Sequence, residues 1–262
     1  PERDEHFSAP PLLFGKTEGS TPFRFSLHVG DVGHTLVVGP TGAGKSVLLA
    51  LMALQFRRYA NSQVFAFDFG GSIRAASIAM GGDWHDLGGG LTDGDDASVS
   101  LQPLARIDDA YERAWAADWI AELLSHEKLI VTPELKEMLW SALTSLSSAP
   151  PEERTLTGLS VLLQSQALKS ALAPWTLEGP FGRLLDAAEN RLTLADVLCF
   201  ETETLMDTPS LVLPVLSYLF HRLEARFDGR PTLLILDEAW VYLDNPTFAQ
   251  RIREWLKTLR KK

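Results

Sequence analysis

Short apolar runs recur along the chain, and their spacing predicts β-strands. In the first run, residues 23–29, apolar and polar side chains alternate, which is typical of a half-buried strand. Several later runs are apolar at consecutive positions, as expected for parallel strands buried on both faces. The predicted strands are 23–29, 35–38, 63–68, 84–87, 99–101, 197–200 and 232–236.

Longer segments with helical apolar spacing lie between and after these strands. They cover 45–59, 106–124, 133–146, 157–168, 214–227 and 248–262. Apolar residues surround most of the first helix, so we expect it to be largely buried. The alternation predicts an α/β fold with a mainly parallel central sheet and flanking helices, in one domain spanning 1–262. Residues 107–188 form a predicted helical insertion within that domain.

Composition narrows the class of protein. The 262 residues are 45% hydrophobic and 22% charged, which excludes a disordered chain, and a net charge of −10 excludes a surface that is basic as a whole. The single cysteine, Cys199, cannot form an intramolecular disulfide, which favours a reducing compartment. The longest apolar run, 211–220, is too short for the ~20 residues of a membrane-spanning helix. The chain begins with Pro1 rather than Met, which indicates a piece of a longer protein.

Residues 39–46 read Gly-Pro-Thr-Gly-Ala-Gly-Lys-Ser and match the phosphate-binding loop pattern, between a predicted strand and a predicted helix. In such a loop, backbone N–H groups point at phosphate oxygens and the helix N-terminus adds positive partial charge. Lys45 supplies a full charge near the β- and γ-phosphates, and the Ser46 hydroxyl can ligate Mg²⁺. The predicted nucleotide-binding residues here are Gly39, Pro40, Thr41, Gly42, Ala43, Gly44, Lys45, Ser46 and Val47.

Acidic residues end two of the predicted strands. Asp237 follows the most apolar strand and is the second predicted ligand of Mg²⁺, beside Ser46. Glu238 can orient the attacking water, so Glu238 and Lys45 are the predicted catalytic residues. Asp68 ends the strand that follows the loop helix, and it either lines the nucleotide site or caps the next turn.

Several nucleotide-binding classes lack their defining motifs in this chain. Asp68-Phe69-Gly70 is spelled like the metal-binding triplet of protein kinases, but the kinase catalytic loop is missing from the sequence. The sequence also contains neither the Asn-Lys-x-Asp motif that reads guanine nor the Leu-Ser-Gly-Gly-Gln motif of transporter cassettes. The class that remains is that of RecA-like ring motors.

Five segments, 21–46, 65–68, 104–119, 176–182 and 230–240, carry a resemblance to the ATPase domain of the TrbE/VirB4 family of conjugal-transfer (type IV secretion) ATPases. The resemblance covers nearly the whole chain and implies a RecA-like phosphate-loop NTPase domain at the C-terminal end of a larger subunit. Two departures stand out: Phe69 replaces a usual Lys, and the chain stops at Lys262, before the family's last strands and its sensor motif. A piece without that sensor is expected to bind nucleotide but to hydrolyse it poorly.

The resemblance also implies a function. It implies binding of ATP and Mg²⁺, and ATP hydrolysis that energises pilus biogenesis and substrate transfer. The expected partners are other subunits of the secretion apparatus and further copies of the full protein in a hexamer, at the cytoplasmic face of the bacterial inner membrane. For this piece by itself, a monomer stays open. Two alternatives stay open: a DNA-translocating ring ATPase, which shares every motif, and an assembly module that binds nucleotide with little turnover.

Overall fold

A parallel β-sheet forms the centre of the computed structural model, which describes residues 7, 9–30, 32–89, 99–192, 195–244 and 246–258. The sheet has four strands in the order β4-β5-β3-β6, and β3 pairs in parallel with both β5 and β6. Every residue of β3 and β5 is buried, as expected for parallel strands whose central residues are all apolar. The α/β fold with a parallel central sheet is therefore confirmed. The strands are β3 (Gln63–Asp68), β4 (Asp83–Asp86), β5 (Val197–Glu201) and β6 (Thr232–Leu236).

The chain divides into two compact units. The first contains Pro1–His85, Leu194–Glu203 and Leu223–Lys262, and the second contains Asp86–Thr193 and Thr204–Arg222. The first unit holds the phosphate-loop segment and most of the sheet, with α1 (Lys45–Phe56), α2 (Arg74–Ala79), α10 (Ala239–Leu243) and α11 (Pro246–Thr258). The expected insertion, 107–188, lies within the second unit, which also includes most of α9 (Pro209–Glu224).

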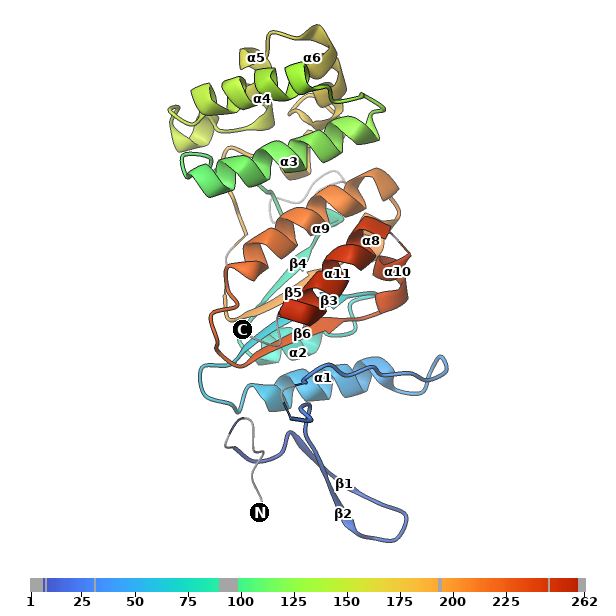
Figure 1. Cartoon of the computed structure of the whole chain (residues 1–262). Helices are drawn as coiled ribbons and strands as arrows, with labels where there is room; N and C mark the ends of the chain where they lie inside the picture. The colour runs from blue at the N-terminus through green and yellow to red at the C-terminus, as the bar shows by residue number, and fades with distance from the viewer. Residues whose placement is uncertain are drawn as a thin grey trace. The chain divides into compact units, whose positions relative to one another are not determined.

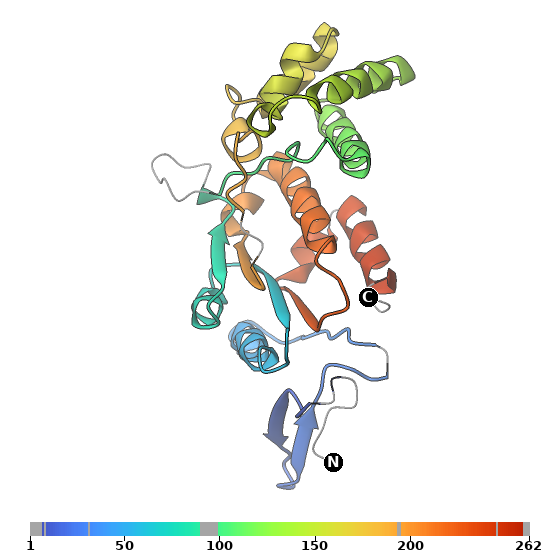
Figure 2. The same cartoon turned by 90° about the vertical axis from the view of Figure 1, so that its left-hand side faces the viewer.

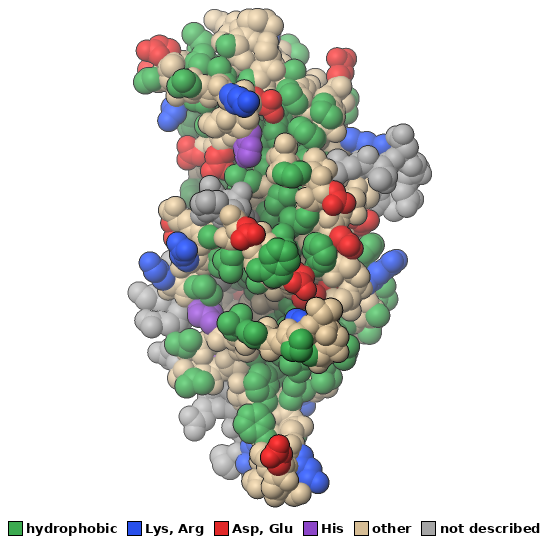
Figure 3. Space-filling model, turned by 90° about the vertical axis from the view of Figure 1, so that its right-hand side faces the viewer, with side chains coloured by type: hydrophobic (Ala, Val, Ile, Leu, Met, Phe, Trp, Pro, Cys, Tyr) green, Lys and Arg blue, Asp and Glu red, His purple; other side chains and the backbone are tan. Residues whose placement is uncertain are grey.

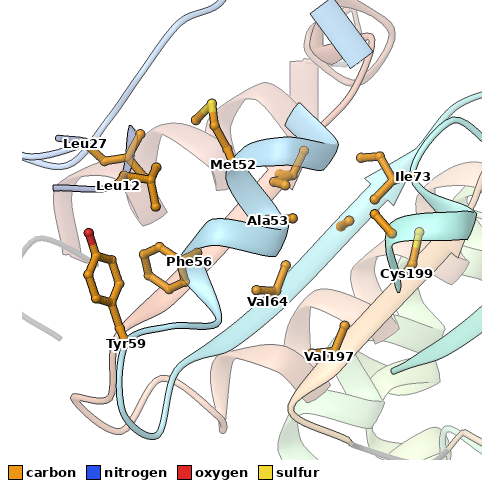
Figure 4. Close-up of a cluster of buried hydrophobic side chains, with 13 residues drawn as sticks. Leu12, Leu27, Met52, Ala53, Phe56, Tyr59, Val64, Ile73, Val197 and Cys199 are labelled. Carbon is orange, nitrogen blue, oxygen red and sulfur yellow. The ribbon is translucent and has the colours of Figure 1, made fainter. Parts of the chain in front are cut away.

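The core of the first unit forms around α1 (Figure 4). This helix lies between the segment that carries Leu12 and Leu27 and the strands that carry Val64 and Val197. Its residues Met52, Ala53 and Phe56 are buried there. A cation–π contact also places the Arg74 guanidinium over the ring of Trp84, 4.3 Å from its centroid, and so links α2 to β4. The phosphate loop is thus attached to a helix whose inner face is fixed by packing.

The second unit is a group of helices (Figures 1 and 2). Side chains of Asp109, Thr132, Thr155 and Ser165 cap the N-termini of four of them. The sequence predicted one helix over 157–168, and that prediction is wrong because Ser165 caps a new helix. The helices are α3 (Ala110–His126), α4 (Pro133–Leu146), α5 (Leu156–Leu162), α6 (Gln166–Leu172), α7 (Gly182–Leu185) and α8 (Glu203–Met206, which starts in the first unit).

Three strand predictions fail in the structure. Residues 35–38 are irregular, because no described segment pairs with them and β6 has only β3 as a described neighbour. Residues 99–101 form no strand either, because Leu101 bonds instead to backbone groups of Leu184 and Ala187. The predicted strand 23–29 shortens to β2 (Pro22–Phe25), which pairs with β1 (Leu13–Lys16) in an antiparallel hairpin that the sequence did not indicate.

The loop helix α1 is less buried than its sequence predicts. Val47 is 73% exposed, and Leu48, Leu51 and Leu54 also reach the surface. Nearby in sequence, Leu36 is 82% exposed. Figure 3 shows that hydrophobic side chains reach the surface in the view that it draws. The prediction of a largely buried helix is wrong because the described residues cover only the face that bears Met52, Ala53 and Phe56.

No helix in the described part of the chain combines the length and the apolar character needed to cross a bilayer. The Cys199 thiol is buried in β5, and this burial raises its pKa above the ordinary value, so the thiol stays protonated and unreactive.

Candidate nucleotide-binding site

The phosphate-loop segment forms a tight turn that leads directly into α1. Gly42 and Gly44 have φ angles of +80° and +84°, which explains glycine at both positions. A Cβ atom built on either residue would meet nothing within 4 Å, so open space lies above the loop. Gly44 is the N-cap of α1, has no capping side chain, and is followed by no acidic residue in the first helical turn. The first N–H groups of α1 are therefore available to an anion.

Lys45 is the first residue of α1, and its side chain turns back over the loop. The Lys45 ammonium donates to the carbonyl oxygens of Gly39 at 3.0 Å and Pro40 at 3.1 Å. These bonds hold a positive charge above the turn. The other predicted loop residues, including Thr41 and Ala43, form the turn itself, and Val47 directs its side chain to solvent, so it can contribute only its backbone N–H.

Ser46 and Asp237 meet although about 190 residues separate them in the chain. The Ser46 hydroxyl donates to the Asp237 carboxylate at 3.3 Å. Asp237 is buried directly after β6, where its N–H donates to the carbonyl of Phe67 in β3. One hydroxyl and one carboxylate thus face each other at the carboxyl end of the sheet, while their role as Mg²⁺ ligands stays a prediction.

Asp68 is fully buried at the end of β3, and both of its carboxylate oxygens are engaged. One accepts from the Ser72 hydroxyl at 2.6 Å, and the other accepts from the Ile73 N–H at 2.8 Å. The Ser72 hydroxyl also lies 3.2 Å from Asp237. Asp68 therefore caps the turn before α2 and reaches the predicted metal ligand through Ser72, while a direct contact with nucleotide stays a prediction.

A third carboxylate, Glu201, lies at the same sheet edge and was missed from the sequence. In the strand register Glu201 is opposite Asp68. Glu201 accepts hydrogen bonds from the N–H groups of Gly70, Gly71 and Glu203 and so fixes the turn after β3. The sequence signal that could have identified Glu201 is its position at the end of an apolar strand, which it shares with Asp68.

We expect Glu201→Ala to lower the free energy of unfolding by about 1.5–3 kcal/mol, because it removes the buried carboxylate to which the N–H groups of the turn donate charge-assisted hydrogen bonds. Urea unfolding followed by circular dichroism measures this loss. The control is Glu178→Ala, which removes an exposed carboxylate and should change stability by less than about 0.5 kcal/mol. Equal stability of the two variants would contradict a structural role for Glu201.

Glu238 follows Asp237 in a left-handed backbone conformation, with φ 47° and ψ 45°. Its N–H donates to the Asp237 carboxylate at 3.0 Å. Its side-chain oxygen Oε2 accepts a hydrogen bond from the indole N–H of Trp240. A non-glycine residue in this region costs about 1–3 kcal/mol and is frequent at functional sites.

The residues present fit a Mg²⁺-nucleotide. The open N-terminus of α1, the Lys45 ammonium and the glycine-rich turn suit the phosphates, and the Ser46–Asp237 pair suits a hard cation that keeps most of its ligands as phosphate oxygens and water. Within the described residues no group of three or more His, Cys, Asp and Glu side chains could hold a metal by itself.

Comparison with known proteins gives relatives over nearly the whole chain, although no protein-family model matches it. The chain is 45% identical over 252 residues to a probable TrbE conjugal transfer protein of Sinorhizobium fredii, an alignment that covers 96% of this chain and 38% of that protein. It is also 45% identical over 255 residues to the conjugal transfer protein TrbE of Rhizobium radiobacter, covering 97% of this chain and 31% of that protein.

More distant relatives carry the name VirB4. The type IV secretion system protein virB4 of Bartonella henselae is 26% identical over 251 residues, which cover 94% of this chain and 31% of that protein. The solved structure of VirB4 of Thermoanaerobacter pseudethanolicus matches with a TM-score of 0.67 at 19% identity, covering 96% of this chain and 74% of that one, and it supports the RecA-like fold. The chain spans about a third of the length of these curated relatives. On this similarity, the chain belongs to the TrbE/VirB4 family of conjugal-transfer and type IV secretion proteins.

Proposed function

We propose that the chain binds Mg-ATP and hydrolyses it as a motor domain that energises conjugal transfer through a type IV secretion system. The observation that carries the proposal is the junction between the phosphate-loop segment and the end of β6. There the Ser46 hydroxyl and the Asp237 carboxylate lie 3.3 Å apart, beside a loop whose helix N-terminus is open. The 45% identity to two TrbE proteins supplies the biological setting.

Each residue has a separate task in this proposal. The backbone N–H groups of residues 42–47 bind phosphate oxygens, and Lys45 exchanges its carbonyl partners for the β- and γ-phosphates. Ser46 and Asp237 hold Mg²⁺, which neutralises phosphate charge when it is bound. Glu238 orients the attacking water and accepts its proton. Asp68, through Ser72, keeps Asp237 in place.

The names of the relatives support a setting for the domain in a secretion apparatus. We propose that the longer subunit works peripherally at the cytoplasmic side of the inner membrane, as a hexamer, and contacts other subunits of the secretion apparatus. Proteins with this family's names belong to conjugal transfer and type IV secretion. The net charge of −10 gives no support to broad DNA binding by the chain.

We expect an equilibrium titration of the chain to show saturable binding of Mg-ATP and weaker binding of ATP when EDTA removes Mg²⁺, since Ser46 and Asp237 contact the nucleotide only through the metal. Mg-GTP serves as the comparison ligand. The same samples are examined for mass and for phosphate release, with and without single- and double-stranded DNA. Absence of any saturable nucleotide binding would overturn the proposal.

The same experiment separates two other functions. Phosphate release that DNA stimulates, with a DNA affinity that falls steeply as salt rises, would identify a DNA translocase. A rise in mass on nucleotide binding without multiple turnover, in this chain and in one extended past Lys262, would identify an assembly module. Turnover that DNA does not change is the result expected for the proposed function.

A further inference from the structure

Trp240 is an exposed aromatic residue beside the proposed catalytic carboxylate. It lies in the first turn of α10, two residues after Glu238, and 62% of its surface is exposed. Its indole N–H donates a hydrogen bond to Oε2 of Glu238. The proposed function as stated above gives this side chain no task. Burial does not explain the residue either, because an indole that is largely exposed gains little stabilisation from it.

Hydrogen bonds fix the backbone of Glu238, so only the rotamer of its side chain decides where the carboxylate points. Its N–H bonds to the Asp237 carboxylate at 3.0 Å, and its carbonyl accepts from Val241 at 2.9 Å. The left-handed conformation is thereby fixed on both sides of the residue. A half-exposed glutamate has three rotatable side-chain bonds, so without a partner its carboxylate would sample several directions.

We propose that Trp240 is a positioning residue for Glu238, and this inference rests on the proposed function. The indole N–H binds Oε2 and thereby holds the carboxylate in one orientation, which leaves Oε1 to accept the proton of the attacking water. A catalytic base that is oriented by a third group is a recurring arrangement in nucleophilic catalysis. Trp240 donates only to the base and touches neither substrate nor metal in this scheme.

The kinetic test is Trp240→Phe, which keeps the aromatic ring and removes the N–H donor. We expect kcat for Mg-ATP to fall about tenfold, part of the ~10²–10⁴-fold that general acid–base catalysis contributes, while KM changes by less than about twofold. The matched control is Trp140→Phe in α4, where the ring is 43% exposed and far in sequence from the loop and from Asp237. It should leave kcat and KM unchanged.

A double-mutant cycle tests whether Trp240 acts through Glu238. In a Glu238→Gln background the further change Trp240→Phe should have no additional effect on kcat, because the carboxylate that it orients is gone. An equal fall in both backgrounds would overturn the proposal and assign Trp240 a separate role, such as a contact with a neighbouring subunit.

A second readout does not depend on turnover. The indole N–H resonance of Trp240, identified by its absence from the Trp240→Phe spectrum, should move in Glu238→Ala, which removes its acceptor, and stay in place in the control Glu178→Ala. An unmoved resonance in Glu238→Ala would overturn the proposal even if the chain hydrolyses nothing. Failure of the proposed function looks different, since Mg-ATP binding itself would then be absent from the unsubstituted protein.

Discussion

Replacing Lys45 with Ala is expected to weaken Mg-ATP binding by about a hundredfold and to abolish measurable turnover. The Lys45 ammonium donates to the carbonyl oxygens of Gly39 and Pro40, which keeps its charge beside the turn that is proposed to bind the phosphates. Charge-assisted hydrogen bonds from such a group are worth about 1.5–3 kcal/mol, and 1.4 kcal/mol corresponds to tenfold in Kd. Isothermal titration calorimetry measures the affinity, and phosphate release measures the turnover.

The matched control is Lys136→Ala, which removes an exposed lysine of α4 and should bind Mg-ATP as the unsubstituted chain does. Thermal unfolding of both variants checks that the loop substitution has not unfolded the domain. Unchanged affinity in a folded Lys45→Ala variant would remove the phosphate-loop segment from nucleotide binding, and the proposed function would then fail.

The sequence could predict those parts of the candidate site that depend on residues adjacent in the chain or on a general rule of sheet topology. The loop from Gly39 to Ser46 carries its own pattern, since phosphate binding needs glycines, a lysine and a hydroxyl in adjacent positions. Asp237 could be paired with Ser46 because a buried parallel strand ends at the edge of the sheet where the loop also lies. Both predictions used neighbours in sequence or a general rule of sheet topology.

The features of the site that were missed depend on strand register and side-chain direction. Glu201 could not be placed opposite Asp68 before β3 and β5 were known to pair directly. Ser72 approaches Asp237 only because the turn after β3 folds back over the sheet edge. The hydrophobic pattern also could not show that no described strand pairs with residues 35–38 or that much of α1 is exposed. Strand formation and burial depend on which segments pack alongside.

The exposed apolar residues of α1 bear on how the loop is supported. Only the inner face of the helix is fixed, by Met52, Ala53 and Phe56, while Val47 and Leu51 near the loop face solvent. Large apolar side chains in solvent lose about 1.5–3 kcal/mol each relative to full burial. Further burial of this face by any added chain would therefore stabilise the helix from which Lys45 and Ser46 project.

Glu238→Gln is expected to leave the Kd for Mg-ATP within about twofold and to slow hydrolysis by about 10²–10³-fold. The substitution keeps the size of the side chain and an oxygen that can still accept from Trp240, but the amide cannot take the proton of the attacking water. We expect binding to be spared because the proposed phosphate contacts come from the loop and Lys45 and the proposed metal ligands are Ser46 and Asp237, so Glu238 belongs to neither set.

The measurement pairs a binding titration with single-turnover phosphate release, so that a change in product release is not mistaken for a change in chemistry. Glu254→Gln on α11 is the matched control, because it makes the same chemical change at an exposed glutamate to which the proposed site gives no role, and it should hydrolyse ATP at the unsubstituted rate. An unchanged rate in Glu238→Gln would show that Glu238 is not the base. The positioning role of Trp240 would then fail with it, whereas nucleotide binding through Lys45 would stand, since the two depend on different elements of the same sheet edge.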